Sequence, residues 1–350
     1  MRKNFTAINL YSSYHFIALT LIIIGLILST TACQPVSGPT AQETAHAEDM
    51  NKIISQMNIT LTVEAALTQV AGEMQQTLTA QAPTPMPDPI SAPTEPLLPT
   101  LSPTPEPPSG TIMSSPVDGM TLVYIPSGIF PMGSSDSDPG SFDHEKPQHN
   151  VYLDGYWIDQ TPITNYMYAA CVQAGHCSPP AHPAAEKIPY DSSVMAYQPI
   201  IYVSWFDAEI YCEWAGRRLP TEAEWEKAAR GTDGRLYPWG ENKPHSGTAN
   251  FNNTLGITTD VGEYPEGASP FNILDMAGNV RQWVADWYQE NYYAISPDTN
   301  PLGPESGTER VLRGGAYSDT AVNLRSATRF FHEPGSPGIN RGFRCAVSIP

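Results

Sequence analysis

Residues 218–231 of the chain read RLPTEAEWEKAARG, and this stretch determines more local structure than any other. Thr221 and Glu224 stand three residues apart and form a capping box, in which each side chain accepts a hydrogen bond from the other residue's backbone N–H. The helix that begins there is expected to end near Arg230-Gly231, because glycine readily adopts the conformation that terminates a helix. Trp225 lies inside this helix and is interpreted as a core residue.

Two further helices are predicted upstream by the same signals. Thr164 can cap a helix that runs to Ala174 with a glycine as its stop, and Ser204 can cap another that runs to Ala215. Strands are harder to find. The sequence predicts one at 122–125, ended by a proline, and a final one in which Phe343, Cys345 and Val347 alternate with Arg344 and Ala346. Two or three helices, few strands and many long loops indicate an α+β domain.

Composition excludes several classes of protein. The 350 residues include 36 acidic and 18 basic side chains, a net charge of -18, and only 15% of residues are charged. A chain this acidic repels phosphate, so we expect no nucleic-acid partner. Residues 111–350 carry 28 of the acidic and 15 of the basic side chains. A single long apolar run, at the N-terminus, excludes a protein with several membrane spans.

The N-terminus has the features of an export signal. Two basic residues precede an apolar run over 17–28, and small residues then lead to Cys33. We interpret 1–32 as a lipoprotein-type signal peptide, after which Cys33 would carry lipid and hold the chain at the membrane. Thr30 stands where leucine is usual, and the alternative is an uncleaved anchor helix, because the run is near the lower length for a span. Both interpretations place the rest of the chain outside the cytoplasm.

Residues 33–110 are expected to form a largely disordered stalk. Its first part, 34–82, is rich in Ala, Thr and Gln, and apolar residues at helical spacing over 67–78 also permit a short helix. Its second part, 83–108, contains 11 prolines, which favours an extended and semi-rigid spacer. The folded domain is therefore placed at 111–350.

Cysteine spacing indicates disulfides in that domain. With Cys33 lipidated, four cysteines remain, and an even number in an exported chain is typical of disulfide bonding. Three pairings are possible. Cys171 and Cys177 are close in sequence and are the favoured partners, which leaves Cys212 with Cys345. On the chain-entropy view, closing the longer loop stabilises the fold by at most about 5 kcal/mol. Four free buried thiols are the alternative.

Seven segments together resemble the formylglycine-generating enzyme (sulfatase-modifying factor) family. They occur in family order over about 122–348, nearly the whole domain. The resemblance implies the family's loop-rich variant of the C-type lectin fold, in which the helix cysteine pairs with the terminal-strand cysteine, here Cys212 with Cys345. The segments are IPSGIFPMG (125–133), PIIYVSWFDA (199–208), RLPTEAEWE (218–226), YPWG (237–240), DMAGNV (275–280), RGGAY (313–317) and RGFRCA (341–346).

The resemblance implies a chemistry for which this sequence lacks the residues. Enzymes of the family oxidise a cysteine of a sulfatase peptide to formylglycine with O2 and copper, and two cysteines after the Gly-Gly turn bind Cu(I). Asp319 stands where the first falls, and the second falls around Asn323 or Leu324. Carboxylate and amide oxygens are hard ligands that cannot replace two thiolates for Cu(I). We therefore expect no copper. The family's tryptophan is Arg281 here, and its glutamate is Gln282.

Calcium is the metal that the resemblance favours. Ca²⁺ takes six to eight oxygen ligands, which loops rich in Asp, Asn and carbonyl groups can supply. Gln282 replaces a carboxylate, so affinity at the first site should be weaker. Alternatively, Asp275 and Asn279 make only loop hydrogen bonds. The matching positions are Asp275, Gly278, Val280 and Gln282 for the first site, and Asn250 and Phe251 for a second.

Three other groups of residues have simpler explanations. His144, Glu145 and His149 could hold a metal, but a solvated acidic loop is the favoured interpretation, because no ligand spacing repeats. The tryptophans on the matched segments are interpreted as core. Four arginines late in the chain are interpreted as buried partners of carboxylates rather than as an anion site; they are Arg313, Arg325, Arg329 and Arg344.

Two functions compete. The first is a non-catalytic recognition module, anchored at the membrane, whose loops 316–324 and 330–341 bind a peptide, protein or glycan. The second is an oxidase of the family's kind that converts a sulfatase cysteine to formylglycine. A structural envelope protein without a defined ligand is a third, simpler possibility.

Overall fold

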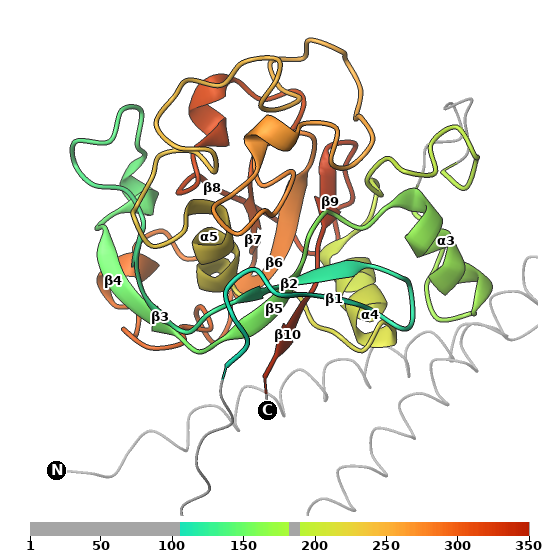
Figure 1. Cartoon of the computed structure of the whole chain (residues 1–350), viewed down its shortest axis with the longest axis horizontal. Coiled ribbons are helices and arrows are strands. Elements are labelled where there is room, and N and C mark those ends of the chain that lie inside the picture. The colour runs from blue at the N-terminus through green and yellow to red at the C-terminus, as the bar shows by residue number, and fades with distance from the viewer. Residues whose placement is uncertain (1–105, 182–189, 350) are drawn as a thin grey trace, which may run out of the picture. The chain divides into compact units, whose positions relative to one another are not determined.

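The computed structural model describes residues 106–181 and 190–349. Its described part contains three short-stranded sheets and three α-helices joined by long loops (Figure 1). The predicted signal peptide, Cys33 and most of the predicted stalk lie outside the described residues. The strands are β1 (Ile112–Ser114), β2 (Thr121–Ile125), β3 (Gly128–Met132), β4 (His149–Leu153), β5 (Tyr156–Asp159), β6 (Arg281–Trp287), β7 (Arg310–Arg313), β8 (Arg329–His332), β9 (Arg341–Phe343) and β10 (Ala346–Ser348).

The three helices lie where the capping signals placed them. They are α3 (Asn165–Gln173), α4 (Trp205–Trp214) and α5 (Glu222–Arg230). Thr221 and Glu224 form the predicted capping box of α5, and Ser204 forms one with Asp207 at α4. At α3 the Thr164 hydroxyl accepts from the Met167 N–H at 3.2 Å. The predicted helices are therefore confirmed.

Strand pairing arranges the sheets as two four-stranded layers and one hairpin. The first sheet has the order β1-β2-β5-β10, the second is the hairpin β3-β4, and the third has the order β8-β7-β6-β9. Helix α5 packs against the hairpin and against β6 and β7 (Figure 1). All nine of its residues are buried, so the helix that the sequence determines best is also a central element of the core.

The prediction of one strand at the C-terminus was wrong. Strand β9 pairs in parallel with β6, whereas β10 pairs antiparallel with β5 in a different sheet. The two residues between them change the direction of the chain. Cys345 bonds to Cys212, and the side chain of Arg344 is fully buried. The α+β, loop-rich prediction is confirmed, but most strands were not recognised, because most of them have three to five residues and are too short to show alternation.

Two disulfides close the described domain. Cys171 pairs with Cys177 and Cys212 with Cys345, with Cα–Cα distances of 5.3 and 5.7 Å, which confirms the predicted pairing. The second bond joins α4 to the segment between β9 and β10, and both of its cysteines are fully buried. It therefore fixes the C-terminal end of the chain to the helical side of the domain.

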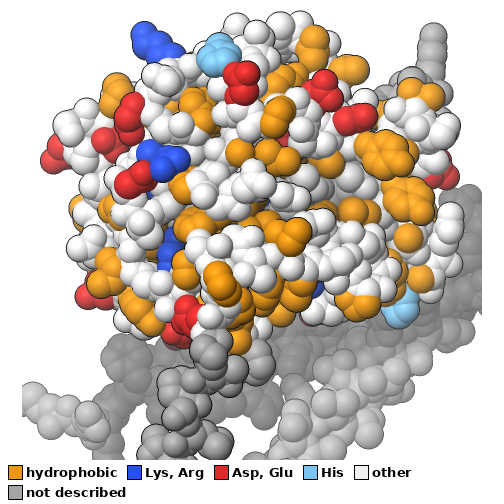
Figure 2. Space-filling view, viewed as in Figure 1, with side chains coloured by type: hydrophobic (Ala, Val, Ile, Leu, Met, Phe, Trp, Pro, Cys, Tyr) orange, Lys and Arg blue, Asp and Glu red, His pale blue; other side chains and the backbone are white. Residues whose placement is uncertain are grey.

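The described surface agrees with the acidic composition. On the face shown in Figure 2, acidic side chains are spread along the rim, and Lys and Arg side chains form no continuous area. Among the described residues, no helix combines the length and the apolar character needed to cross a membrane.

Candidate functional site

A glycine turn after β7 forms the centre of the candidate site. Gly314 and Gly315 adopt positive φ values of 91° and 70°. A side chain at Gly314 would meet the Trp225 ring at 3.0 Å, and one at Gly315 would meet the Asn323 carbonyl oxygen at 2.8 Å. Glycine is therefore required at both positions, both by the backbone conformation and by the close neighbours.

Asp319 closes this turn and binds Arg281. Its Oδ2 accepts from the Arg281 Nε at 2.8 Å, and its Oδ1 accepts from the Nη2 at 2.6 Å. Oδ2 also accepts from the backbone N–H of Ala316 at 2.8 Å. A bidentate arginine–carboxylate pair of this kind is among the stronger polar contacts in proteins. The Asp319 side chain is 9% exposed and that of Arg281 is 23% exposed.

The residues aligned with the copper cysteines do not form a soft-metal site. Asp319 is engaged by Arg281, Leu324 is buried among hydrophobic side chains, and the side chain of Asn323 lines a cavity. All four cysteines of the described residues are in disulfides. The donors at this place are a carboxylate and an amide, which do not fit Cu(I). Arg281 further places a positive charge against Asp319.

A cavity of about 230 Å³ lies beside this ion pair, and aromatic side chains form much of its wall. The Phe331 ring stacks on Tyr288 with centroids 3.8 Å apart, and His144 meets both rings edge-on. The Arg281 guanidinium lies 4.0 Å from the centroid of Phe330. The cavity is lined by Phe142, His144, Arg281, Asn323, Arg329, Phe330 and Phe331.

Gln282, predicted as a calcium ligand, is bound within the core instead. Its Oε1 accepts from the Trp225 Nε1 at 2.9 Å and from the Arg344 Nε at 2.6 Å, so both lone pairs are used. Its Nε2 donates to the Asp275 carbonyl at 2.7 Å. Burial lowers the pKa of Arg344 to about 10, and a Ca²⁺ ion at Gln282 would have to lie beside that positive charge. Gln282 therefore does not fit a calcium ion.

The rest of the first calcium set offers one carboxylate. Asp275 is buried, and its Oδ2 accepts from the Gly262 N–H at 2.6 Å. Burial raises the pKa of Asp275 to about 6. With Gln282 engaged elsewhere, this carboxylate and the carbonyl groups of Gly278 and Val280 fall short of the six oxygens that Ca²⁺ takes. Asn279 bonds to both backbone groups of Thr259, as the simpler interpretation expected.

Asn250 of the second predicted set has a free oxygen. Its Nδ2 donates to the Ile257 carbonyl at 2.9 Å, but its buried Oδ1 has no hydrogen-bond partner among the described residues. The carbonyl of Phe251 already accepts two bonds from Thr254. A cavity of about 250 Å³ adjoins this loop and is lined partly by Ser246, Asn250, Asn252 and Thr254. An orphaned oxygen beside other oxygens fits a cation better than Gln282 does. Within the described residues, no three His, Cys, Asp or Glu side chains converge as a metal site.

Buried ion pairs surround the candidate site. The guanidinium of Arg313 donates to Glu226 at 2.5 Å, that of Arg329 to Glu222 at 2.7 Å, and that of Arg325 to Glu145 at 2.6 Å. These three pairings confirm that the arginines are partners of buried carboxylates.

Two expectations about this part of the chain were wrong. Arg344 bonds to the Gln282 oxygen and to backbone carbonyls instead of to a carboxylate. The loop at 143–149 is not fully solvated, since Glu145 is fully buried and His144 packs among rings. The ion pair to Arg325 accounts for the burial of Glu145, because a buried carboxylate needs a charged partner.

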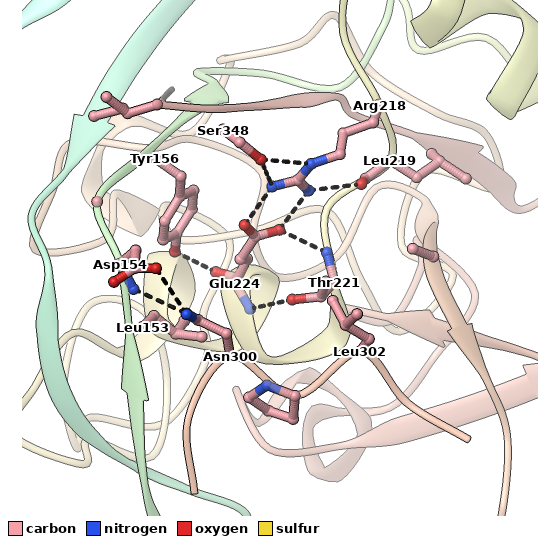
Figure 3. Close-up of a pocket in the computed structure, with 14 residues that line it drawn as sticks. Leu153, Asp154, Tyr156, Arg218, Leu219, Thr221, Glu224, Asn300, Leu302 and Ser348 are labelled. Atoms are coloured by element: carbon pink, nitrogen blue, oxygen red, sulfur yellow. Dashed lines mark hydrogen bonds and ion pairs between the residues drawn. The ribbon is translucent and has the colours of Figure 1, made fainter. Parts of the chain in front are cut away.

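A further cavity, of about 370 Å³, is lined by residues outside this turn (Figure 3). Arg218 crosses it and forms a bidentate pair with Glu224 at 2.6 and 2.7 Å, and also donates to the Ser348 hydroxyl. The Tyr156 hydroxyl donates to the Glu224 carbonyl at 2.6 Å. The labelled polar groups are bonded to one another. These bonds mainly connect α5 with β5 and β10.

Sequence reasoning assigned Asp319 and Asn323 to one region, but it missed the partner of Asp319 and the rings. Arg281 was identified as a replacement for tryptophan, yet nothing in the pattern showed that it meets Asp319, 38 residues away. The available signal was the two replacements taken together. Arg281 adds a positive charge and Asp319 adds a negative charge within the same set of family motifs. Phe142, Phe330 and Phe331 lie outside the matched segments; Phe330 and Phe331 fall within the predicted binding loop 330–341, but no signal identified Phe142.

The short-stranded sheets and loop-rich architecture define a variant of the C-type lectin fold. The sequence profile of the sulfatase-modifying factor enzyme 1-like domain matches residues 108–349, and the chain belongs to that family. It is 38% identical over 244 residues to the serine/threonine-protein kinase Pkn1 of Chlamydia trachomatis, which covers 65% of this chain and 38% of that protein. The match therefore spans well under half of that relative.

Two further similarities agree with this family and fold. The formylglycine-generating enzyme of Streptomyces coelicolor is 36% identical over 276 residues, with 64% of this chain and 88% of that enzyme covered. Among solved structures, PvdO from Pseudomonas aeruginosa superposes with a TM-score of 0.60 at 26% identity. That superposition covers 70% of this chain and all of PvdO.

Proposed function

We propose that this domain recognises a peptide, protein or glycan without catalysis, at the face formed by loops 316–324 and 330–341. One observation carries the proposal: Arg281 and Asp319 form an ion pair at the place where relatives would need two thiolates for copper. Retention of the family fold with loss of those donors supports binding without oxidation.

We further propose that the chain is a lipoprotein, anchored at the membrane through Cys33 and held outside the cytoplasm by its stalk. The two disulfides support an oxidising compartment. The test is metabolic labelling with a radiolabelled fatty acid. The wild-type chain should take up label and fractionate with membranes, whereas Cys33→Ser should do neither. Label retained by the variant would contradict lipidation at this residue.

The alternative is a formylglycine-generating oxidase, which the 36% identity to the Streptomyces enzyme favours. The two functions are separated by incubating the full chain with copper, O2 and a Cys-x-Pro-x-Arg peptide, with mass spectrometry of the peptide and measurement of protein-bound copper. We expect an unmodified cysteine and no stoichiometric copper. Conversion at a catalytic rate would overturn the recognition proposal.

Recognition itself is tested by exposing the full chain to glycan and peptide arrays. Binding should be lost in Phe331→Ala, which removes an exposed ring from the proposed face, and kept in Phe206→Ala, a matched control on the outer side of α4. Both side chains are exposed phenylalanines, so loss of hydrophobic surface alone affects the two variants equally. Equal effects of the two variants would contradict the proposed face.

Calcium is proposed at the Asn250 loop rather than at Gln282. The unpartnered Oδ1 of Asn250 supports this choice, since buried polar atoms are normally bonded. No step of the proposed function depends on the ion.

A further inference from the structure

Strand β8 is an unpaired sheet edge. It is the first strand in the order β8-β7-β6-β9, and it pairs only on the side of β7. No backbone hydrogen bond between the described residues joins its outer edge to another segment. Alternate residues of a strand direct N–H and C=O groups to each side, so two of its four residues present these groups outward. An open edge of this kind is a template for another strand.

The aromatic cavity lies at this edge, and side chains from both faces of the strand line it. Phe331 is 38% exposed and lies on one face with Tyr288 and His144. Phe330, on the opposite face, lies beneath the Arg281 guanidinium. Both rings line the same cavity. A segment alongside β8 would therefore direct neighbouring side chains to a ring on either side.

The charge of the cavity limits what this segment can be. Its ionisable lining residues are Arg281, Arg329 and His144, and none of its lining residues is acidic. Arg329 is paired with Glu222 and Arg281 with Asp319, and burial lowers the pKa of His144. The Arg281 side chain nevertheless keeps 23% of its surface exposed, and Asp319 engages only its Nε and Nη2. A partly exposed guanidinium in a lining without acidic residues favours a ligand that brings a carboxylate.

We propose that an extended, acidic peptide segment of a partner protein adds as a strand to the outer edge of β8. One of its carboxylates approaches Arg281, and the next apolar or aromatic side chain packs against Phe331 and His144. The inference deepens the proposed recognition function and rests on it. A peptide fits better than a glycan because the edge offers a backbone ladder, which only another backbone can complete.

The probe is a pool of acetylated eight-residue peptides. Asp or Glu at a fixed central position is followed by Phe, Tyr or Leu, and a matched pool has Lys in place of the acid. Binding to the detergent-solubilised full chain is measured by fluorescence anisotropy. We expect the acidic pool to bind at least about tenfold more tightly, since charge-assisted bonds are the stronger kind. Equal binding of the two pools would overturn the charge assignment and the proposal with it.

Backbone methylation of the ligand tests strand addition directly. In an edge-bound strand only alternate N–H groups of the peptide face β8. Methylating one alternate set should abolish binding, and methylating the other set should leave it within about twofold, the spread expected of context effects. Equal tolerance of both sets would overturn the strand geometry. The protein is unchanged here, so its folding cannot confuse the result.

Protein variants locate the binding. Phe331→Ala should weaken the acidic pool at least tenfold with a near-native melting temperature, while Phe206→Ala should not. Should no peptide bind while a glycan binds in a Phe331-dependent manner, the strand inference falls and the recognition proposal stands. Absence of any peptide or glycan binding would overturn both.

Discussion

Arg281 and Asp319 bind each other at 2.6 and 2.8 Å, at two positions where the family resemblance implies tryptophan and cysteine. Either replacement alone would leave a poorly solvated charge, and the pair satisfies both. The Asp319 carboxylate also accepts the Ala316 N–H, so the pair supports the glycine turn that precedes it.

This contact predicts a stability effect. Asp319→Ala removes the acceptor for Arg281 and for the Ala316 N–H, and should lower the free energy of unfolding by about 1–3 kcal/mol. The control is Asp233→Ala, because Asp233 forms an exposed pair with Arg235. Exposed pairs contribute about 0–1 kcal/mol. Urea unfolding at neutral pH measures both. Similar losses in the two variants would show that the Asp319 contact is not special.

Breaking a more deeply buried ion pair should lower the free energy of unfolding by a larger amount. Glu226 accepts bonds from the Gly133 N–H, Arg230 and Arg313, and all of it is buried. Glu226→Gln removes the charge partner of buried Arg230 and the nearer of the two partners of Arg313, a loss of about 3–5 kcal/mol. Glu333→Gln, on an exposed carboxylate, is the neutral control. The melting temperatures of the two variants give the comparison. A Glu226 variant that melts close to the wild-type temperature would disprove the importance of this network.

The two disulfides should differ in their effect on stability. The Cys212–Cys345 bond closes 133 residues and the Cys171–Cys177 bond closes 6. On the chain-entropy relation, replacing the first pair by serine costs about 5 kcal/mol and replacing the second about 2 kcal/mol. Denaturant unfolding of the two double variants under oxidising conditions measures both losses of stability. A larger loss from the short loop would contradict the entropic explanation.

One buried carboxyl group predicts how stability depends on pH. Burial, with the nearby Glu222 carboxylate, raises the pKa of Asp286 to about 8. The folded state therefore holds this proton after the unfolded chain has lost it, and stability should fall as pH rises from about 4 to about 8. Asp286→Asn keeps an acceptor for the Glu222 N–H and should flatten this decline, so that it stabilises more at pH 8 than at pH 5.

Asp298→Asn, a change at an exposed carboxylate, is the control for the pH series. Melting temperatures measured from pH 4 to 9 for the three proteins suffice. An unchanged pH profile in Asp286→Asn would show that this group ionises normally.

Calcium removal discriminates between the two predicted calcium loops. Excess EGTA should lower the melting temperature of the wild-type chain, because an ion that binds only the folded state stabilises it by mass action. Asn250→Ala should abolish the EGTA effect. Gln282→Ala should keep that effect while lowering stability, since the Gln282 amide bonds Trp225 and Arg344. The opposite pattern would return the ion to the Gln282 site.

Local signals in the sequence were sufficient for the helices, whereas the disulfide pairing drew on cysteine spacing together with the family resemblance. A capping box such as Thr221 with Glu224 acts within three residues, and it can be recognised without knowledge of the fold. The β9–β10 segment could not be predicted, because its two strands belong to different sheets and the alternation of Phe343, Cys345 and Val347 suggested one. Tertiary pairing decides such short strands.

The candidate site could be predicted only in part. The absence of thiols near Asp319 was readable from spacing, but the acceptor role of Gln282 depends on Arg344, 62 residues away. The residues of the aromatic cavity come from three distant segments and share no motif. Contacts between residues far apart in sequence leave no trace in one sequence, which is why the calcium set was assigned to an engaged side chain.

Helix α5 has a consequence for how this domain can diversify. Through Glu226 and Glu222 it holds Arg313 and Arg329, the residues on either side of the 314–328 segment. That segment is therefore clamped at its two ends from inside the molecule, whatever its middle contains. Substitutions between the clamps can alter what the surface displays while the scaffold beneath stays the same.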